Sequence, residues 1–534
     1  MSSVPQDRYN VLVEFAVKHL DFQRAELESV LDMFGIVLGS NDCRIVPLPT
    51  AAPSSSGQAT PNNRPFYILS FPWGAKGPRY HLEDDPEGNI ATVLSRCTLV
   101  RSVVELWGVG DSIESCADHT RQWVSECPTG KQVLDKRSSL SQSWKTTIHT
   151  LGAKYTREEQ DGMRSRFAFL DFAGPVKMSS PTNEYILIRE VELDKKGGAV
   201  YPRHGLNKQL IPENDARPPL AVYFGRILGQ QGRSIKGRGG IDQYGLKNRR
   251  YLGPTSMDAE LSFVMTNLGQ VERGSVVFDP FVGTGSILLS CALRGAYCVG
   301  SDIDLRVLRG RSEDENVCAN FAQYGLPRPE LVRTDNAIYH RHYRRHEPLY
   351  DAIVCDPPYG IRAGARRTGS RLATPKPVLE EHRHDHIAQT KPYAVSDVMA
   401  DLLDMASRTL VPGGRLVYVI PSFSDFNVET DLPQHECLRL VHVCYQPFTM
   451  DLGRRIVAMK KVAEYDESRR DKYMARVWKN GPESADKCAN IREKILEAAK
   501  KKPGYEEKAA IRKEKRKKHR EAKKLAKLKL GPPL

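Results

Sequence analysis

An acidic residue followed by two prolines and a tyrosine forms the segment of this sequence best suited to chemistry. The apolar run Tyr350–Cys355 predicts a buried strand. It is followed directly by Asp356, Pro357, Pro358 and Tyr359. Two prolines stiffen a turn and remove two backbone donors, which leaves carbonyl groups free to accept hydrogen bonds. Asp356 and the Pro357 carbonyl could then accept both hydrogens of an amino group, while Tyr359 stacks on a planar base. A plain turn with Tyr359 used in packing is the simpler alternative.

A glycine-rich turn earlier in the chain is a candidate cofactor site. It follows the short apolar run Val276–Phe278 and opens onto a predicted helix. Glycines allow a sharp turn and let a ligand approach the backbone closely. The candidate contacts are Asp279, Phe281, Gly283, Thr284 and Gly285.

Acidic and amide side chains end the next two predicted strands. Asp302 and Asp304 are both placed to accept hydrogen bonds from ribose hydroxyls, and the sequence leaves the choice open. Asp335 and Asn336 end the following strand, where they could meet an adenine edge or simply cap a helix. A dinucleotide-binding turn normally has a third glycine, but position 288 is Leu, so a cofactor without phosphates fits better.

These motifs lie in a stretch where predicted strands and helices alternate, which is typical of a parallel α/β sheet. The predicted helices include Leu305–Tyr324 and Val395–Thr409. The predicted strands are Val276–Phe278, Ala296–Gly300, Leu331–Arg333, Tyr350–Cys355 and Arg415–Ile420.

The 534 residues are too many for one ordinary domain. We expect an α+β region over residues 1–218, the α/β domain over 219–462 and a basic helical or disordered tail over 463–534. In the first region Asp21 is a candidate helix cap. Its predicted strands are Tyr9–Phe15, Phe66–Phe71, Leu99–Leu106, Phe167–Phe172 and Tyr185–Ile188.

The net charge of +14 is concentrated at the C-terminus. Between Lys500 and Leu534 there are 15 Lys and Arg against 4 Asp and Glu, a balance of +11 that leaves +3 for the rest. A basic tail on a nearly neutral body suits a polyanionic partner, although a solubilising tail or a nuclear address explains it equally well. We expect no signal peptide and no membrane span, and the scattered cysteines suggest a reducing compartment.

The motifs together resemble those of class I (Rossmann-like) methyltransferases acting on amino nitrogens. More narrowly, the chain resembles the THUMP-containing tRNA (guanine-N2)-methyltransferases that modify guanosine at position 10. The resemblance rests on four segments, at residues 251–262, 279–286, 356–366 and, more diffusely, 166–176. It does not extend to the lysine-rich tail.

This resemblance implies transfer of one methyl group from S-adenosylmethionine to guanine N2, with Asp356, Pro357 and Tyr359 as catalytic residues. It implies tRNA as substrate, and a small zinc-binding activator protein as partner in a heterodimer. The candidate substrate contacts are Pro358, Arg362 and Arg366. The expected location is cytoplasmic, with a nuclear fraction.

Other functions remain open at this stage. An amino-methyltransferase acting on DNA adenine or protein glutamine would use a similar catalytic turn, and a non-catalytic RNA-binding scaffold would keep the fold. A nicotinamide dehydrogenase fits least, since no hydride-site pattern accompanies the glycines. His382, His384 and His386 lack the accompanying ligands of a metal site. Lys247, Arg249 and Arg250 fit either RNA contact or a mobile linker.

Overall fold

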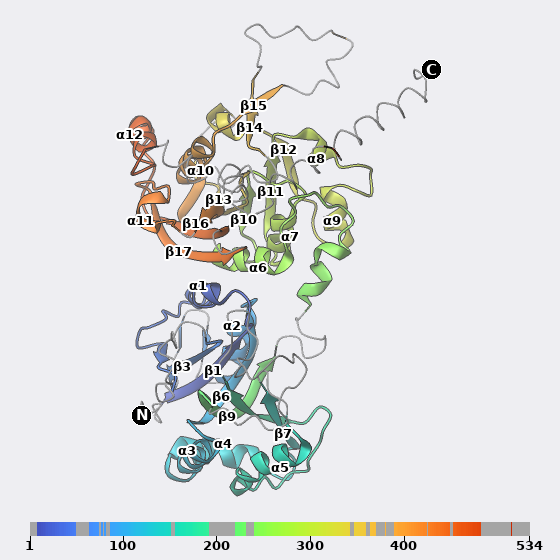
Figure 1. Ribbon diagram of the computed structural model, residues 1–534, viewed down its shortest axis with the longest axis vertical. Helices are drawn as coiled ribbons and strands as arrows, with labels where there is room; N and C mark the ends of the chain where they lie inside the picture. The colour runs from blue at the N-terminus through green and yellow to red at the C-terminus, as the bar shows by residue number, and fades with distance from the viewer. Residues whose placement is uncertain are drawn as a thin grey trace.

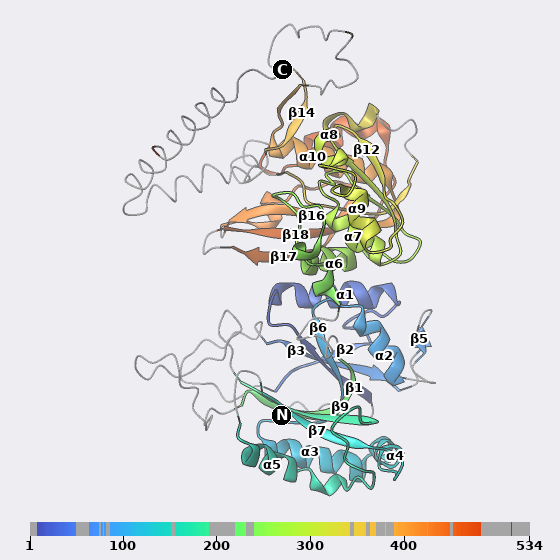
Figure 2. The same ribbon diagram turned by 90° about the vertical axis from the view of Figure 1, so that its right-hand side faces the viewer.

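The computed structural model describes two mixed α/β units joined through a shared core (Figures 1 and 2). The described residues are 8–49, 64–73, 76–77, 80–81, 86–150, 155–191, 219–230, 240–341, 347–358, 364–369, 380, 389–423, 425–448, 452–481 and 514. No helix within these ranges is long and apolar enough to cross a membrane.

The N-terminal unit is built on a seven-stranded sheet with the order β2-β3-β1-β6-β9-β8-β7. Only β7 and β8 run parallel in it, and the other neighbours are antiparallel. Helices α3 (Ile113–Glu126) and α4 (Pro128–Arg137) pack against β6, β8 and β9. The strands are β1 (Arg8–Phe15), β2 (Arg44–Val46), β3 (Phe66–Pro72), β6 (Val100–Gly110), β7 (Trp144–Thr150), β8 (Asn183–Glu190) and β9 (Ala221–Gln230).

The C-terminal unit is built on a second seven-stranded sheet with the order β12-β11-β10-β13-β16-β18-β17. Its first five strands are parallel and follow the doubly wound order 3-2-1-4-5, while β18 and β17 are antiparallel additions. The expected Rossmann-like α/β sheet is therefore confirmed. The strands are β10 (Val276–Asp279), β11 (Tyr297–Asp302), β12 (Glu330–Arg333), β13 (Tyr350–Cys355), β16 (Leu410–Phe423), β17 (Leu438–Pro447) and β18 (Leu452–Lys461).

Helices cover both faces of this second sheet. Helices α6 (Ala259–Leu268), α7 (Ser286–Leu293) and α9 (Val317–Gln323) contribute to the core on one face. Helix α10 (Val395–Thr409) packs on the other face. Because the strand order reverses between β10 and β13, a crevice is expected outside the carboxyl ends of these two strands. Asp279 and Asp356 lie at those ends.

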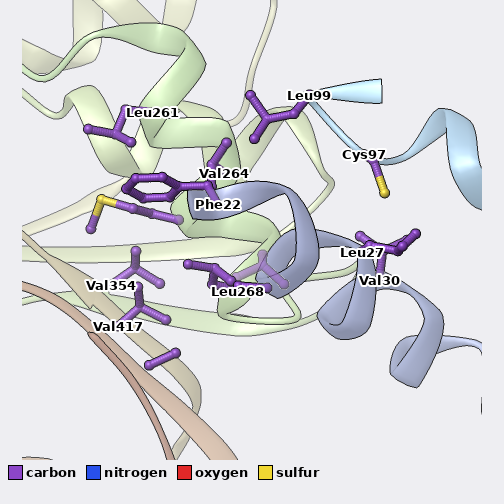
Figure 3. Close-up of a cluster of buried hydrophobic side chains, with 14 of the residues drawn as sticks. Phe22, Leu27, Val30, Cys97, Leu99, Leu261, Val264, Leu268, Val354 and Val417 are labelled. Carbon is purple, nitrogen blue, oxygen red and sulfur yellow. The ribbon is translucent and has the colours of Figure 1, made fainter. Parts of the chain in front are cut away.

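The two units share one hydrophobic core. Helix α1 (Leu20–Met33) of the N-terminal unit lies against α6 and β17 of the other unit (Figure 2). Phe22, Leu27 and Val30 of α1 belong to the same cluster as side chains of α6 and of the second sheet (Figure 3). Asp21, the expected cap of α1, lies inside the first turn instead, and its carboxylate accepts the amide hydrogen of Tyr445 in β17.

The structure differs from the sequence-based expectations in two elements. Phe167–Phe172 is not a strand but contains the short 3-10 helix η2 (Ala168–Leu170), with aromatic rings that pack under β8 and β9. The helix expected over Leu305–Tyr324 is two helices, α8 (Leu305–Arg309) and α9. Gly310 separates them at φ +75°, where an added Cβ would lie 2.2 Å from the Glu315 carbonyl oxygen.

The expected domain boundaries also differ from the fold. A boundary after residue 218 would assign β9 to the C-terminal unit, whereas β9 pairs with β6 and β8. At the other end, the segment after residue 462 folds back onto α10, where Tyr465 donates to the Asp404 carboxylate and Trp478 Nε1 donates to the Ser396 carbonyl. The N-terminal unit thus extends through Gln230, and the C-terminal unit extends to at least Trp478.

Candidate active site

The glycine turn connects β10 to α7 at the reversal point of the sheet. Gly283 and Gly285 adopt φ values of 51° and 79°, in the left-handed region that favours glycine. A Cβ on Gly285 would also lie 2.7 Å from Val317 Cγ1 in α9. Thr284 Oγ1 lies 2.8 Å from Ser256 Oγ, which ties the turn to the segment before α6. The conformation of the turn therefore requires glycine at both positions. The contact with Ser256 stabilises the turn from the segment before α6.

The two acids after β11 have different surroundings. Asp302 is half-buried and faces the turn: its carboxylate accepts the amide hydrogens of Gly283 at 3.1 Å and Asp304 at 2.9 Å. Burial raises its pKa. Asp304 instead caps α8 and pairs with exposed Arg306 at 2.7 Å, and this pairing lowers its pKa. Of the two, only Asp302 is directed at the glycine turn.

A second carboxylate, Asp279, is buried at the floor of the same crevice. It accepts the Phe281 amide hydrogen at 2.9 Å, so it holds the start of the turn in place. Burial raises its pKa well above the usual range, and the negative charges of Asp302 and Asp356 act in the same direction. The three acids end or follow neighbouring parallel strands, Asp302 in β11, Asp279 in β10 and Asp356 after β13, so they lie at the same edge of the sheet.

Asp335 and Asn336 follow β12 and serve different purposes. The Asp335 carboxylate accepts the amide hydrogens of Ala337 at 3.0 Å and Thr368 at 2.6 Å. It thereby anchors strand β14 (Arg366–Thr368), which pairs with β15 (Thr390–Pro392). Asn336 is 8% exposed, and its Nδ2 has no hydrogen-bond partner among the described residues. Asn336 therefore keeps a donor available for a hydrogen bond to a ligand, whereas the Asp335 carboxylate is already used by two backbone amides.

The β14–β15 hairpin also contacts the glycine turn. Phe281 packs against Ala365 and Tyr393, which flank the two strands of the hairpin. Arg366, expected to bind substrate, directs Nε and Nη2 to Thr390 across the hairpin. The hairpin thus links the segment after Asp356–Pro358 to both Phe281 and Asp335.

Asp356 emerges from β13 at the same end of the sheet. Its Oδ1 is buried and has no hydrogen-bond partner within the described ranges. Burial raises the pKa of Asp356 to about 6, and the positive charge of Arg454 opposes this shift. Pro357 is buried and Pro358 half-buried beside it. Tyr359 and Arg362 lie outside the described residues.

Sequence reasoning missed Arg454. Side chains alternate along a strand, so Asp356 lies on the same sheet face as Val354, and Arg454 on the same face as Ile456. Val354 and Ile456 both belong to the core that contains α6 and α7. Arg454 Nε donates to Gln446 Oε1 at 2.6 Å, which fixes the guanidinium at this end of β18. A charged pair, Arg454 and Arg455, directly before the apolar run Ile456–Met459 was the available signal.

A metal site requires several ligating side chains close together. Among the described residues, no group of three or more His, Cys, Asp or Glu side chains could hold a metal ion. His382, His384 and His386 lie outside those residues.

A doubly wound sheet with a glycine turn after its first strand, and an acid with two prolines after its fourth, defines a class I amino-methyltransferase. Two family models agree with this class. Residues 247–376 match the model described as RMKL-like, methyltransferase domain, and residues 80–233 match the Tmrp11 THUMP N-terminal domain.

Curated proteins identify the family. The chain is 34% identical over 480 residues to proteins named tRNA (guanine(10)-N(2))-methyltransferase TRMT11 from Pongo abelii and Homo sapiens. Each match covers 88% of this chain and 90% of the relative. The Dictyostelium discoideum protein of that name is 34% identical over 463 residues, covering 86% of this chain and 83% of the relative. The chain belongs to the tRNA (guanine(10)-N(2))-methyltransferase family.

Among solved structures, TrmN from Thermus thermophilus aligns with a TM-score of 0.36 at 14% identity, over 85% of this chain and all of that one. A score this low supports no argument beyond the fold described above.

Proposed function

We propose that this chain transfers a methyl group from S-adenosylmethionine to the N2 amine of guanosine at position 10 of tRNA. The observation that carries the proposal is the Asp356 carboxylate, with a buried oxygen that has no partner among the described residues, at the strand end facing the glycine turn. Membership of the family supports the choice of guanosine over DNA adenine or protein glutamine.

The residues around the glycine turn fit the proposed cofactor. S-adenosylmethionine supplies an electrophilic methyl group when bound. Asp302 would accept hydrogen bonds from the ribose hydroxyls, because it is the acid directed at the turn. Asn336 Nδ2 would donate to the adenine, and the left-handed glycines allow close approach of the methionine part. The conformation of the turn is stabilised by Asp279, Phe281 and Thr284. Asp335 contributes indirectly, because it anchors β14 through the Thr368 amide.

Catalysis on an exocyclic amine depends mainly on position. The lone pair of guanine N2 is delocalised into the ring, so the base must be held with that lone pair directed at the methyl group. Asp356 accepts one N2 hydrogen at its free Oδ1, and the Pro357 carbonyl accepts the other. Tyr359 and Pro358 hold the base plane. After transfer, Asp356 receives or relays the proton that the amine loses.

Arg454 adds a positive charge beside this pocket. Its Nε is used by Gln446, but a guanidinium carries further N–H donors at Nη1 and Nη2. A phosphate or base edge of the target nucleotide can use these donors. Gln446 Nε2 lies 3.5 Å from His19 Nδ1, so the N-terminal unit reaches this side of the pocket. Arg362 and Arg366 remain the proposed substrate contacts on the other flank of the motif in sequence, because both follow Asp356–Pro358 closely along the chain.

The second proposed partner, the small zinc-binding activator, needs an open surface. Strand β12 ends the sheet, and no other described strand pairs with its outer edge. Val332 within it is 49% exposed. An edge strand with unpaired backbone groups is a template for strand addition by another chain. We place the activator on this edge.

We further infer a cytoplasmic location, with a nuclear fraction allowed by the basic tail. The ten cysteines in the described part of the chain are all free thiols, and nine of them are buried. Unpaired thiols suit a reducing compartment.

The proposal is tested by incubating unmodified tRNA with the full chain, S-adenosylmethionine and the candidate activator. Mass spectrometry of the digested nucleosides should detect N2-methylguanosine, and nuclease mapping should locate it at position 10. The same reaction with Asp356→Ala, which removes the acceptor for the amine, should yield no detectable product. Methylation of another base, or of protein alone, would refute the assignment.

A further inference from the structure

Arg249 is a buried cation for which the described protein supplies no acidic partner. It lies between η4 (Leu246–Asn248) and α6, and only 6% of its surface is exposed. Its Nε donates to the Tyr244 carbonyl at 3.1 Å, and its Nη1 donates to Ser286 Oγ at 2.6 Å. Nη2 is buried and has no hydrogen-bond acceptor among the described residues. These contacts exclude a surface RNA contact or a mobile linker for Arg249.

No carboxylate in the described residues forms an ion pair with Arg249. The acid whose charge reaches it, Asp258, caps α6 by accepting the Leu261 amide hydrogen. Burial lowers the pKa of Arg249, as expected for a guanidinium that lacks a counter-ion. A buried charge without a partner is strongly unfavourable, so such a group usually meets an anion in the working protein.

The contact of Arg249 with Ser286 places it at the start of α7. Ser286 is the first residue of that eight-residue helix and follows Gly285 directly. The first amides of a helix have no acceptor within the helix and carry partial positive charge. Arg249 and these amides together form the kind of environment that binds anions.

The segment that follows Arg249 wraps the glycine turn. Asn320 accepts the Tyr251 amide hydrogen at 2.9 Å, and its Nδ2 donates to the Thr284 carbonyl at 3.3 Å. Ser256 contacts Thr284 from the same segment. Arg249 is therefore attached to the wall of the proposed cofactor site.

The chemistry of the cofactor identifies the anion. With the ribose at Asp302 and the methyl group directed at Asp356, the amino-acid end remains for the turn between Gly283 and Ser286. The carboxylate of that end is the single anionic group of S-adenosylmethionine. A guanidinium and a carboxylate match in charge and in the planar fork of donors and acceptors. An RNA phosphate would require a more exposed arginine.

We propose that Arg249, together with the first amides of α7, binds the carboxylate of the methionine part of S-adenosylmethionine. The inference rests on the proposed function, because it assumes that cofactor. It adds a recognition residue that lies outside the glycine turn and the strand ends.

The test compares S-adenosylmethionine with its decarboxylated analogue, which lacks only the carboxylate. Binding of each to the full chain is measured by titration calorimetry. The wild type should bind the carboxylated cofactor about 10- to 100-fold more tightly, as expected for lost charge-assisted hydrogen bonds. Arg249→Met should bind the two ligands with nearly equal affinity. The ratio of affinities is the readout, so a general loss of stability in the variant does not imitate the effect.

Arg250→Met is the matched control, because Arg250 is the exposed neighbour and should keep the wild-type ratio. If Arg249→Met does not fold, Arg249→Lys keeps the charge without the fork and should reduce the ratio several-fold. A wild type that binds both ligands equally, or variants at 249 that keep its preference, would overturn the inference and leave the proposed function standing. A wild type that binds neither ligand would overturn both.

Discussion

The Glu26 carboxylate in the N-terminal unit accepts a hydrogen bond of 2.7 Å from Asn267 Nδ2 in the C-terminal unit. Both residues are fully buried. Glu26 also accepts the amide hydrogens of Thr98 at 2.7 Å and Leu99 at 2.9 Å, so one carboxylate satisfies donors from both units. Arg415 of β16 pairs with Asp32 of α1 at 3.0 Å beside it. Such an interface holds the N-terminal unit at one orientation to the second sheet.

Replacing Glu26 should therefore loosen the interface. Glu26→Ala leaves the backbone amides of Thr98 and Leu99 without their acceptor and removes the only carboxylate that Asn267 Nδ2 contacts among the described residues. We expect the free energy of unfolding to fall by about 2–4 kcal/mol. Chemical denaturation measures this loss. As a control, Asp118→Ala in α3 removes a solvent-exposed pair with Arg121 and should cost less than about 1 kcal/mol. Equal effects of the two substitutions would show that the buried carboxylate does not connect the units.

Loss of the Asp356 carboxylate should abolish methyl transfer but not cofactor binding. Asp356→Ala removes the acceptor for the amine and should lower the turnover number by about 100- to 10,000-fold. Calorimetry with S-adenosylmethionine should give nearly the wild-type affinity, because Asp356 faces the amine rather than the adenosine. A variant that keeps a large share of wild-type turnover would contradict this role.

Substitution of Asp302 and of Asp304 should have different effects on cofactor affinity. Asp302→Ala should weaken cofactor binding by about 1–3 kcal/mol through loss of hydrogen bonds to the ribose. Asp304→Ala should leave cofactor affinity nearly unchanged and instead destabilise α8, because it removes a cap worth about 0.5–2 kcal/mol. Calorimetry and thermal unfolding of both variants distinguish the effects. The reverse pattern would assign the ribose to Asp304.

The pH dependence of turnover should report the ionisation of Asp356. Burial raises its pKa to about 6, so the carboxyl group stays protonated to a higher pH than an exposed aspartate. The ionised carboxylate is the stronger hydrogen-bond acceptor and is the form that can take up the proton of the amine, so turnover should fall as the pH drops through about 6. Single-turnover rates with saturating cofactor between pH 5 and 9 measure this step.

Arg454 should influence the same profile. Its positive charge favours the ionised form of Asp356, so Arg454→Met should move the inflection to higher pH. Arg439→Met in β17, which is exposed, should leave the inflection in place. An unchanged profile in the Arg454 variant would mean that its charge does not reach the catalytic carboxylate.

The basic tail should contribute affinity without sequence discrimination. Deletion of Lys500–Leu534 removes a balance of +11, and phosphate attraction of this kind depends steeply on salt. The truncated chain should bind tRNA less tightly at low ionic strength and show a flatter salt dependence. The modified nucleotide should not change. A shifted methylation site, or an unchanged salt slope, would exclude this role.

The chemistry of this protein is encoded in short contiguous segments, and for that reason the sequence alone was enough to predict it. Asp279–Gly285 and Asp356–Pro358 each end a buried strand, and the parallel α/β pattern brings the carboxyl ends of those strands together. The family relationship confirms the function class that these segments predicted. The strand predicted over residues 167–172 was wrong, because aromatic rings that pack under a sheet resemble a strand in composition.

Only the tertiary structure decided between residues of the same type. Asp302 and Asp304 are two positions apart, and the fold turns one toward Gly283 and the other toward Arg306. Arg454, Arg249 and Glu26 gain their importance from partners distant in sequence: respectively Asp356, Ser286 and Asn267. Local sequence specifies strands and turns, but burial and charge compensation depend on which distant side chains the fold brings into contact.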